Sequence, residues 1–426
     1  MEPVIGLDFG TTNSAIAVAD NDRQAALASF ADGPAIITNF RSILYFPARD
    51  RSSPQKVETQ AGPEAINSYL DDDTKGRLVV SIKSYLASRL FTSTSINGRH
   101  YTLEDLIAII LRRLRNAAIE QFGTAATQVV LGRPVRFAGA DNAEDEQLAL
   151  QRLRTAAELA GFQQISFELE PVAAAYQYET QLDHDELVLI GDFGGGTSDF
   201  TVARLGPGRK KAGHSPVLGT SGIAIAGDTF DSRIMMRLVA PKLGLGSHYV
   251  SLGKELPVPV WVYSKLSSWH HMFLLKEPKT MAVLREVRNQ AAEPQKVAAL
   301  VQIIAENLGY ALYRAVEQTK VALTDKELAD FLFTQSTVRL EDTLERWQFE
   351  SWIQDDIQNI AACVRSLLDQ CNVKPADIDS IFLTGGSSFV PVVRRFFSRT
   401  FGADKLRSGE ELTTVAKGLA LRALEN

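Results

Sequence analysis

Two segments of the chain run from an apolar stretch into almost the same turn, and this repetition limits the possible folds more than any other feature. The first is IGLDFGTTNSAIAV at residues 5–18, and the second is IGDFGGGTSDF at residues 190–200. The tripeptide Asp-Phe-Gly occurs in both segments. Each segment is typical of a β-hairpin with a glycine-rich turn. A fold that uses this hairpin twice is expected to have two related halves.

The pattern of apolar residues predicts alternating strands and helices after the first hairpin. Residues 103–122 form a strongly amphipathic helical pattern, and residues 145–160 form another that Gly161 closes. From 244 to 346 the sequence is helix-rich and less regular, with one long helical pattern at 295–323. Further predicted elements are a mixed helical stretch at 65–90, strands at 128–135 and 379–386, a strand running into a helix at 165–179, a strand, turn and helix at 222–243, and helices at 347–371 and 389–401.

The length of 426 residues exceeds what one ordinary hydrophobic core supports, so two or more lobes are expected. We place lobe I at residues 1–186 and lobe II at residues 187–407, with an inserted subdomain at about 241–346. Residues 408–426 are expected to form a C-terminal helix that returns to lobe I. The alternation of strands and helices predicts an α/β fold.

Composition excludes several classes of protein. A net charge of -6 and a pI near 5.7 argue against non-specific binding of nucleic acid or a membrane surface. The first residues lack the pattern of a secretory signal, and no segment reaches the ~18 apolar residues of a spanning helix, so we expect a cytoplasmic location. The two cysteines, Cys363 and Cys371, fit buried thiols in a reducing compartment better than a disulfide or a metal site. The adjacent His270 and His271 lack companion ligands and are expected to be structural.

The two glycine turns have the residue types that a phosphate chain requires. Backbone N–H groups can converge on phosphate oxygens only where side chains are small or absent. Two such turns would hold a polyphosphate from opposite sides. The residues in question are Gly10, Thr11, Thr12 and Asn13 in the first turn, and Gly194, Gly195, Gly196 and Thr197 in the second.

Carboxylates flank both turns, and next to a polyanion they require a cation. Asp8, Asp192 and Asp199 are therefore predicted to surround a hydrated Mg²⁺ ion, mostly through its water ligands. The simpler interpretation is a pair of tight hairpins with Asp-stabilised loops, and for a single turn it would be preferred. The repetition of the whole phrase favours the nucleotide interpretation.

A third element, TGGSSFVPVV at residues 384–393, joins a buried strand to a helix expected after Ser387. Its paired glycines would let a flat group approach the backbone, and a helix N-terminus favours polar or anionic partners. By itself this element is weak evidence for a nucleotide site, because the strand-Gly-Gly-helix pattern also occurs wherever a helix packs tightly.

The phrases DFGTTNSAIAV, DFGGGTSDF, AGDTFDSR and FLTGGSSFVP, in this order, closely resemble the nucleotide-binding domain of the seventy-kilodalton heat-shock chaperones of the DnaK type. That family belongs to the actin, hexokinase and heat-shock ATPase superfamily. The resemblance extends from Val4 to about Ala423 and is weak between 244 and 308. It implies a two-lobed actin-like ATPase fold with duplicated, ribonuclease H-like lobes and an inserted helix-rich subdomain.

The same resemblance implies roles for individual residues. Lys83 matches a lysine that contacts the γ-phosphate and attacking water, Glu170 a glutamate that orients this water, and Pro134 a proline linked to interlobe signalling. The implied catalytic set is Lys83, Glu170, Asp8, Asp199 and Thr197, and the implied adenosine end is Gly227, Glu317, Lys320, Thr324, Gly385, Gly386, Ser387 and Phe389.

Simpler interpretations of these residues remain open. Lys83 could be a helix lysine with its stem on an apolar surface, and Glu170 an acid that complements a helix dipole. Glu317 and Lys320 have the spacing of a surface salt bridge.

Some positions depart from the family pattern. Phe389 stands where the family usually has an arginine that stacks on adenine, so it could stack in its place or pack in the core. Val321 replaces a basic residue beside the adenine pocket, and the acid expected shortly before TVAKGLALRA has no clear counterpart, with Glu411 the nearest candidate. Nucleotide affinity and base preference are therefore open.

The expected function is that of an ATP-binding and ATP-hydrolysing, chaperone-like protein, a short, stand-alone and divergent family member. The ligands implied are ATP or ADP with Mg²⁺, with K⁺ as a further candidate ion, and the partners are unidentified co-chaperones or clients. The family normally continues into a peptide-binding β-sandwich and a helical lid, neither of which the sequence shows, so peptide clamping is not expected. Two alternatives are a sugar-type small-molecule kinase of the same superfamily, and a nucleotide-sensing or polymerising protein with little catalysis.

Overall fold

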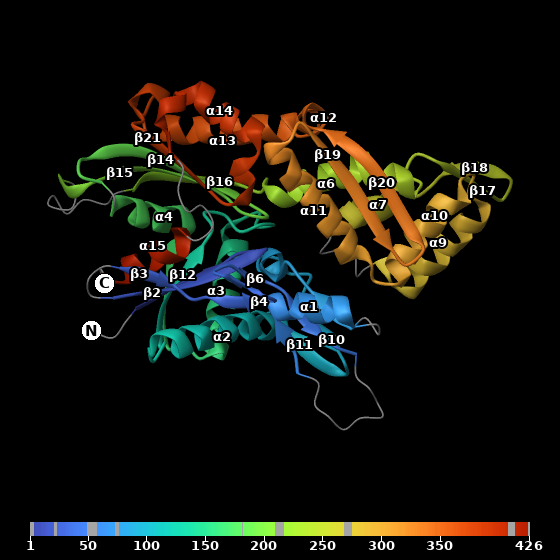
Figure 1. Cartoon of the computed structure of the whole chain (residues 1–426), viewed down its shortest axis with the longest axis horizontal. Helices are drawn as coiled ribbons and strands as arrows, with labels where there is room; N and C mark the ends of the chain where they lie inside the picture. The colour runs from blue at the N-terminus through green and yellow to red at the C-terminus, as the bar shows by residue number, and fades with distance from the viewer. Residues whose placement is uncertain are drawn as a thin grey trace. The chain divides into compact units, whose positions relative to one another are not determined.

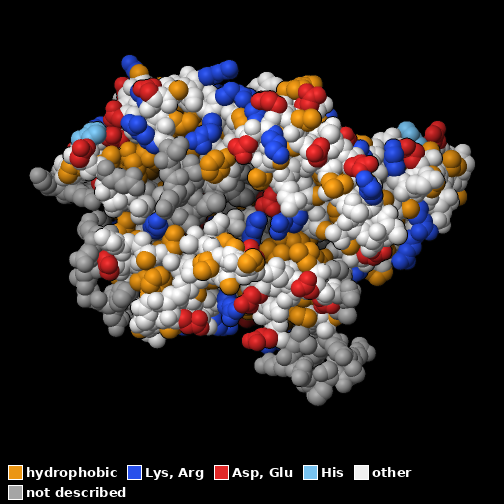
Figure 2. Space-filling model, in the orientation of Figure 1, with side chains coloured by type: hydrophobic (Ala, Val, Ile, Leu, Met, Phe, Trp, Pro, Cys, Tyr) orange, Lys and Arg blue, Asp and Glu red, His pale blue; other side chains and the backbone are white. Residues whose placement is uncertain are grey.

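The computed structural model describes residues 4–20, 24–48, 58–72, 76–180, 182–208, 217–267, 275–407 and 414–424 (Figure 1). It contains two compact units. Unit 1 consists of Met1–Ala226, Asn359–Ser388 and Val393–Asn426, and unit 2 consists of Gly227–Gln358 and Phe389–Val392. Among the helices in these ranges, none is long and apolar enough to cross a membrane. Basic and acidic side chains are interspersed on the face shown in Figure 2.

The first sheet of unit 1 contains the N-terminal hairpin. Its strands are ordered β13-β12-β1-β2-β3, and β6 also pairs with β2. Strand β2 is antiparallel to β1 and β3, whereas β12 runs parallel to β1 and β13 parallel to β12. The strands are β1 (Val4–Phe9), β2 (Asn13–Ala19), β3 (Ala25–Leu27), β6 (Phe40–Arg41), β12 (Gln128–Arg133) and β13 (Gln164–Leu169).

The second sheet of unit 1 repeats this topology. Its order is β16-β15-β14-β21-β22, with β15 antiparallel to both neighbours, β21 parallel to β14 and β22 parallel to β21. The prediction of an α/β fold with duplicated lobes is therefore confirmed. The strands are β14 (Glu186–Phe193), β15 (Ser198–Leu205), β16 (Val217–Ile223), β21 (Ser380–Thr384) and β22 (Leu406–Arg407).

Alternating side chains on the first sheet explain which helices cover its two faces. On β2, Ile16 and Val18 join the large core beneath α2 (Leu103–Phe122) and α3 (Ala143–Ala160). Ala15, Ala17 and Ala19 point to the other face and pack with Ala416 and Ala420 of α15 (Thr414–Ala423). Small side chains on this face allow α15 to lie close to the sheet.

Helices α15 and α4 (Glu170–Glu179) pack against each other between the two sheets (Figure 1). Their contact is very close, because a Cβ atom at Gly418 would lie 1.7 Å from the carbonyl oxygen of Ala173. Val188 and Ile190 of β14 join Leu419 of α15 in one buried cluster. These two helices therefore link the sheets of unit 1.

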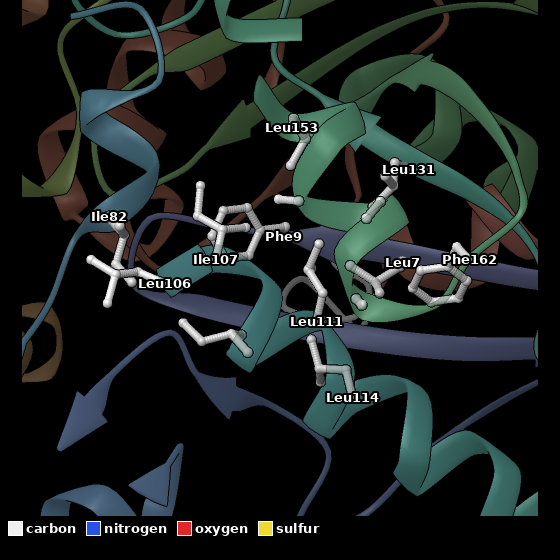
Figure 3. Close-up of a cluster of buried hydrophobic side chains, with 14 of the residues drawn as sticks. Leu7, Phe9, Ile82, Leu106, Ile107, Leu111, Leu114, Leu131, Leu153 and Phe162 are labelled. Carbon is white, nitrogen blue, oxygen red and sulfur yellow. The ribbon is translucent and has the colours of Figure 1, made fainter. Parts of the chain in front are cut away.

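The larger core of unit 1 lies on the opposite face of the first sheet (Figure 3). Leu7 and Phe9 of β1 pack there with Leu111 of α2 and Leu153 of α3. Helix α2 has the bounds predicted from the sequence, and Thr102 caps it with a reciprocal hydrogen-bond pair to Asp105.

The remaining elements of unit 1 are short or peripheral. The predicted mixed helical stretch at 65–90 contains one helix, a strand and a short 3₁₀ helix at Ile82–Tyr85. Helix α14 begins at Pro391, later than the sequence pattern indicates, because a 3₁₀ turn occupies Gly386–Phe389. The other elements are β4 (Phe30–Asp32), β5 (Ala35–Ile37), β7 (Leu44–Phe46), β8 (Gln60–Ala61), α1 (Pro63–Asp71), β9 (Arg77–Val79), β10 (Ser93–Ile96), β11 (Arg99–Thr102), α13 (Gln354–Gln370) and α14 (Pro391–Phe401), the last two of which begin in unit 2.

Unit 2 is mainly helical but contains two hairpins that the sequence pattern does not predict. Strands β17 and β18 pair with each other, as do β19 and β20. The predicted long helix at 295–323 is divided in two, since Asn307 adopts a positive φ of 57° that ends the first helix. The elements are α6 (Gly227–Ile234), β17 (His248–Ser251), β18 (Lys254–Pro257), α7 (Val260–Ser267), α9 (Pro278–Gln290), α10 (Pro294–Ala305), α11 (Gly309–Asp325), β19 (Leu328–Gln335), β20 (Val338–Glu345) and α12 (Arg346–Trp352).

Candidate functional site

The first turn, residues 10–13, connects β1 and β2. A Cβ atom at Gly10 would lie 2.1 Å from the carbonyl oxygen of Asn13, so only glycine fits here. Ser42 holds the turn from outside: its hydroxyl donates to the carbonyl of Gly10 (2.8 Å), and its amide donates to the carbonyl of Thr12 (2.9 Å). No motif contains Ser42. It reaches the turn only because β6 folds back beside β2.

The second turn, residues 194–197, connects β14 and β15. The amide of Gly194 donates to the carbonyl of Thr197 (2.9 Å), which closes the turn. A Cβ atom at Gly196 would lie 3.8 Å from Thr11 Oγ1, so the second turn approaches the first. The structure thus brings together the two turns that the sequence predicts as phosphate-binding elements.

The third predicted element follows β21 and lies against β14. Gly385 has a φ of +80°, and a Cβ atom there would lie 2.1 Å from the carbonyl oxygen of Phe193. Thr384 pairs in parallel register with Asp192, and its hydroxyl donates to Asp192 Oδ1 (2.6 Å). The motifs do not single out Thr384 as an orienting residue, although a hydroxyl residue directly before Gly-Gly is a usable signal.

Lys83 and Glu170 form a buried ion pair. Lys83 Nζ lies 2.6 Å from Glu170 Oε1, and each side chain is less than a tenth exposed. Lys83 belongs to the 3₁₀ helix at 82–85, and Glu170 is the first residue of α4. Lys83 is therefore more than a helix lysine with its stem on an apolar surface. Glu170 likewise does more than complement the dipole of α4.

Asp199 connects the two sheets of unit 1. It is buried on β15, opposite Asp192 of β14, and its Oδ1 accepts a hydrogen bond from the amide of Val135 (2.9 Å). Val135 directly follows Pro134, whose carbonyl accepts a hydrogen bond from Arg133 Nε (2.9 Å). The loop after β12 is therefore tied to the second hairpin through this aspartate.

The charges around the ion pair are unbalanced. Burial raises the pKa of Asp8 well above its usual value, and Glu170 and Asp192 raise it further, while Lys83 lowers it. Burial and Glu170 also raise the pKa of Asp192, to about 6, against the opposing effects of Thr384 and Lys83. For Asp199, burial and then Glu170 raise the pKa well above the usual range.

The pKa of Lys83 is also raised, although burial acts on an ammonium group in the opposite direction. Burial alone would lower its pKa, but Glu170, Asp8 and Asp199 outweigh burial and raise it. Four carboxylates thus face one ammonium group, and added positive charge would stabilise their ionised forms. In the described residues, no group of three His, Cys, Asp or Glu side chains is placed to ligate a metal ion directly.

Of the remaining predicted binding residues, Gly386 and Ser387 belong to unit 1, and the others belong to unit 2. Lys320 of α11 forms an ion pair with Asp231 of α6 (2.7 Å) and lies 3.5 Å from the carbonyl oxygen of Gly227. Lys320 therefore forms a buried pair with Asp231, a residue of the phrase AGDTFDSR to which the sequence analysis assigned no role. Glu317 lies 3.9 Å from Arg314 instead.

The other positions that the sequence analysis names differ in their exposure. Thr324 donates its hydroxyl to the carbonyl of Val321 (2.7 Å), and Val321 is 56% exposed. Phe389 is 39% exposed in a 3₁₀ turn, so it is not a core residue. Gly386 has open space where a Cβ atom would be, and Ser387 is buried. Glu411, His270 and His271 lie outside the described residues, and both cysteines are free thiols.

Comparison with known proteins identifies the family of the chain. The family model described as Hsp70 protein matches residues 63–242 and 293–424. The chaperone protein DnaK of Thermosipho africanus is 26% identical over 430 residues, which cover 99% of this chain and 59% of that protein. DnaK of Deinococcus proteolyticus is also 26% identical, with the same coverage. The chain thus spans about three-fifths of the length of these relatives. Because the family model matches well over half of its residues, the chain belongs to the Hsp70 family, whose nucleotide-binding domain has the actin-like ATPase fold.

Proposed function

We propose that the chain binds ATP or ADP with Mg²⁺ and hydrolyses ATP as a chaperone-type ATPase. The observation that carries this proposal is the buried Lys83–Glu170 pair, which lies among three aspartates beside two glycine turns. Hsp70 proteins use a nucleotide with Mg²⁺, and membership of the family favours ATPase activity.

The residues present fit such a ligand. A Cβ atom at Gly10 would lie 2.1 Å from the carbonyl oxygen of Asn13, and the glycines of both turns leave the backbone uncovered by side chains, as phosphate binding requires. Asp8, Asp192 and Asp199 offer oxygen atoms in a region short of positive charge, which suits a hydrated Mg²⁺ ion. When bound, Mg²⁺ supplies positive charge next to the phosphate oxygens. We infer that K⁺ is a further candidate ion on the same grounds.

The chain's own groups would act mainly by positioning and electrostatics. Lys83 brings an ammonium group to the phosphate to be transferred, and Glu170 orients the attacking water. Thr197 would hold Asp199 through the hydrogen bond between their side chains. Pro134, next to the amide that binds Asp199, is placed to sense changes there.

We propose that the residues which the family resemblance implies for the adenosine end bind this group. Lys320 would need to exchange part of its contact with Asp231 for the nucleoside. Phe389 has an exposed aromatic face that suits stacking. The proposed set is Gly227, Glu317, Lys320, Thr324, Gly385, Gly386, Ser387 and Phe389.

A chaperone-type role implies client or co-chaperone proteins, and we propose that the nucleotide state controls such contacts in the cytoplasm. The printed names of the relatives, chaperone protein DnaK, support this class of partner. No specific partner follows from the residues of the site.

Calorimetry and turnover measurements together test the proposal. Titration of the purified chain with ATP and with ADP, each with Mg²⁺ and with EDTA, is expected to show binding that Mg²⁺ strengthens, and phosphate release is expected to be slow. Lys83→Ala and Glu170→Ala should bind Mg·ATP but lose turnover, whereas Lys276→Ala, an exposed lysine, should not. Absence of ATP binding at millimolar Mg²⁺ would refute the proposal. Strong stimulation of ATP consumption by pooled metabolites would indicate a kinase.

A further inference from the structure

Lys83 lies in a segment, residues 81–91, whose backbone hydrogen bonds are local. The amides of Ser84, Leu86 and Ser88 each donate to the carbonyl three residues earlier, at 3.0–3.1 Å. Such short 3₁₀ turns are weak in isolation. The position of Lys83 therefore depends on contacts that other elements make with this segment.

The start of the segment is held in an unfavourable conformation. Ser81 has a φ of +50°, in the left-handed region that residues with side chains seldom adopt. Its hydroxyl is buried and has no hydrogen-bond partner among the described residues. Ile82 is inserted in the core beside Leu106 and Ile107 of α2 (Figure 3). This apolar contact holds the first half of the segment.

One arginine holds the second half. Arg152 projects from α3, and its Nη1 donates to the carbonyl oxygens of Tyr85 (3.2 Å), Leu86 (3.2 Å) and Ser88 (2.8 Å). Its Nη2 donates to the carbonyl of Phe91 (3.2 Å). A planar guanidinium with several donors is suited to join carbonyls that point in different directions.

The Arg152 contact is protected from solvent. Its side chain is 12% exposed, and its Nε lies 3.4 Å from Glu104 Oε1 of α2. Arg89 also contacts Asp145 (3.1 Å) and Glu144 (3.2 Å) of α3, but its side chain is 61% exposed, so these contacts are expected to contribute little. Arg152 is therefore the main polar link between α3 and this segment in the described structure.

The partner of Lys83 is anchored separately. Glu170 begins α4, which is packed against α15 through the close approach at Gly418. The 2.6 Å distance between Lys83 and Glu170 thus depends on two elements that are held by different contacts. A small shift of either element would break the pair.

We propose that Arg152 is a positioning residue, whose guanidinium holds residues 81–91 so that Lys83 stays paired with Glu170. The part of this inference that concerns ATP turnover rests on the proposed function. The part that concerns the position of Lys83 does not, and it can be measured without nucleotide.

Hydrogen exchange of the nucleotide-free protein tests the contact directly. Arg152→Met removes all the donors but keeps an apolar stem. Amides in a peptide covering residues 82–91 are expected to exchange at least about ten-fold faster, because hydrogen bonds to a charged group strengthen local protection. The matched control is Arg112→Met: Arg112 also donates from a helix to a backbone carbonyl, that of Leu159, but away from this segment. Exchange at the wild-type rate in folded Arg152→Met would overturn the proposal.

Competitive acetylation reports on Lys83 itself. In the wild type, Lys83 is buried and paired, so it should react slowly relative to the exposed Lys276. Arg152→Met should raise the relative labelling of Lys83 at least about ten-fold, and Arg152→Lys, which cannot reach all four carbonyls, should lie between. If Arg152→Met does not fold, the test uses Arg152→Lys. Labelling of Lys83 in Arg152→Lys at the wild-type rate would then overturn the proposal.

Measurement of ATP turnover separates this inference from the proposed function. If the wild type hydrolyses ATP, Arg152→Met should lower kcat at least about ten-fold while KM stays within about two-fold, and Arg112→Met should change neither. Altered labelling with unchanged kcat would overturn the link between Arg152 and catalysis. If the wild type hydrolyses no ATP, the proposed function fails, and exchange and labelling still decide whether Arg152 positions Lys83.

Discussion

The hydroxyl of Thr384 donates a 2.6 Å hydrogen bond to Asp192 Oδ1 and so joins the ends of two parallel strands, β21 and β14. This bond fixes one oxygen of a carboxylate that we propose to hold hydrated Mg²⁺. It also opposes the effect of burial on the pKa of Asp192. Thr384 therefore helps to keep Asp192 both oriented and ionised.

Replacing Thr384 by Val, which has a similar shape, should weaken the Mg²⁺-dependent part of ADP binding about ten-fold, since a hydrogen bond to a charged group contributes roughly 1.5–3 kcal/mol. Thr384→Ser, which keeps the hydroxyl, should stay close to wild type. Calorimetric titrations with Mg²⁺ and with EDTA measure the difference. An equal loss of affinity in both conditions would show that Thr384 acts on the fold rather than on the carboxylate.

Lys83→Met should lower the free energy of unfolding by about 3–5 kcal/mol, because it leaves Glu170 buried without its counter-ion. Adding Glu170→Gln should recover part of this loss. Urea unfolding of the two single variants and the double variant at pH 7.5 gives the coupling energy. Strictly additive losses would mean that the pair has no specific interaction.

Stability of unit 2 should depend on pH through Asp228. Burial, followed by Asp231, raises the pKa of Asp228 to about 6. Its contribution to stability is present below its unfolded pKa of about 3.9 and is lost as the pH rises through about 6.

Asp228→Asn cannot ionise, so its stability relative to wild type should rise between pH 4 and pH 8 by up to ~3 kcal/mol. Chemical unfolding of both proteins across this range measures the difference. A constant difference at all pH values would contradict the assignment.

Gly418→Ala should destabilise unit 1 by about 1–3 kcal/mol, because the added methyl group would meet the carbonyl of Ala173 and force α15 away from α4. The matched control is Gly386→Ala, where the space for a Cβ atom is open. Thermal unfolding should show a lower Tm for the first variant only. Equal Tm values would mean that α15 adjusts without cost.

Local patterns were sufficient to predict much of the fold of unit 1. The first hairpin, the bounds of α2 and the strand of Gln128–Arg133 follow from the periodicity of the apolar residues and from turn residues. The repeated Asp-Phe-Gly phrase predicts two equivalent hairpins because the same turn chemistry demands the same local backbone. The matching strand order of both sheets then follows from one topology used twice.

Contacts between distant segments could not be predicted in this way. Ser42 and Arg152 act through hydrogen bonds to residues far away in the sequence, so no spacing reveals them, and Thr384 is marked only by its place directly before Gly-Gly. In unit 2, the alternation in β19 (Leu328–Gln335) is a visible strand signal, but helical patterns on both sides obscure it. The break at Asn307 lies within a helical pattern of apolar residues that continues across it, so periodicity alone does not predict it.

The close packing of α15 on the first sheet has a consequence for folding during synthesis. The alanine face of β2 is made long before α15, the helix that covers it. During synthesis on the ribosome, this apolar face therefore stays uncovered until α15 has emerged.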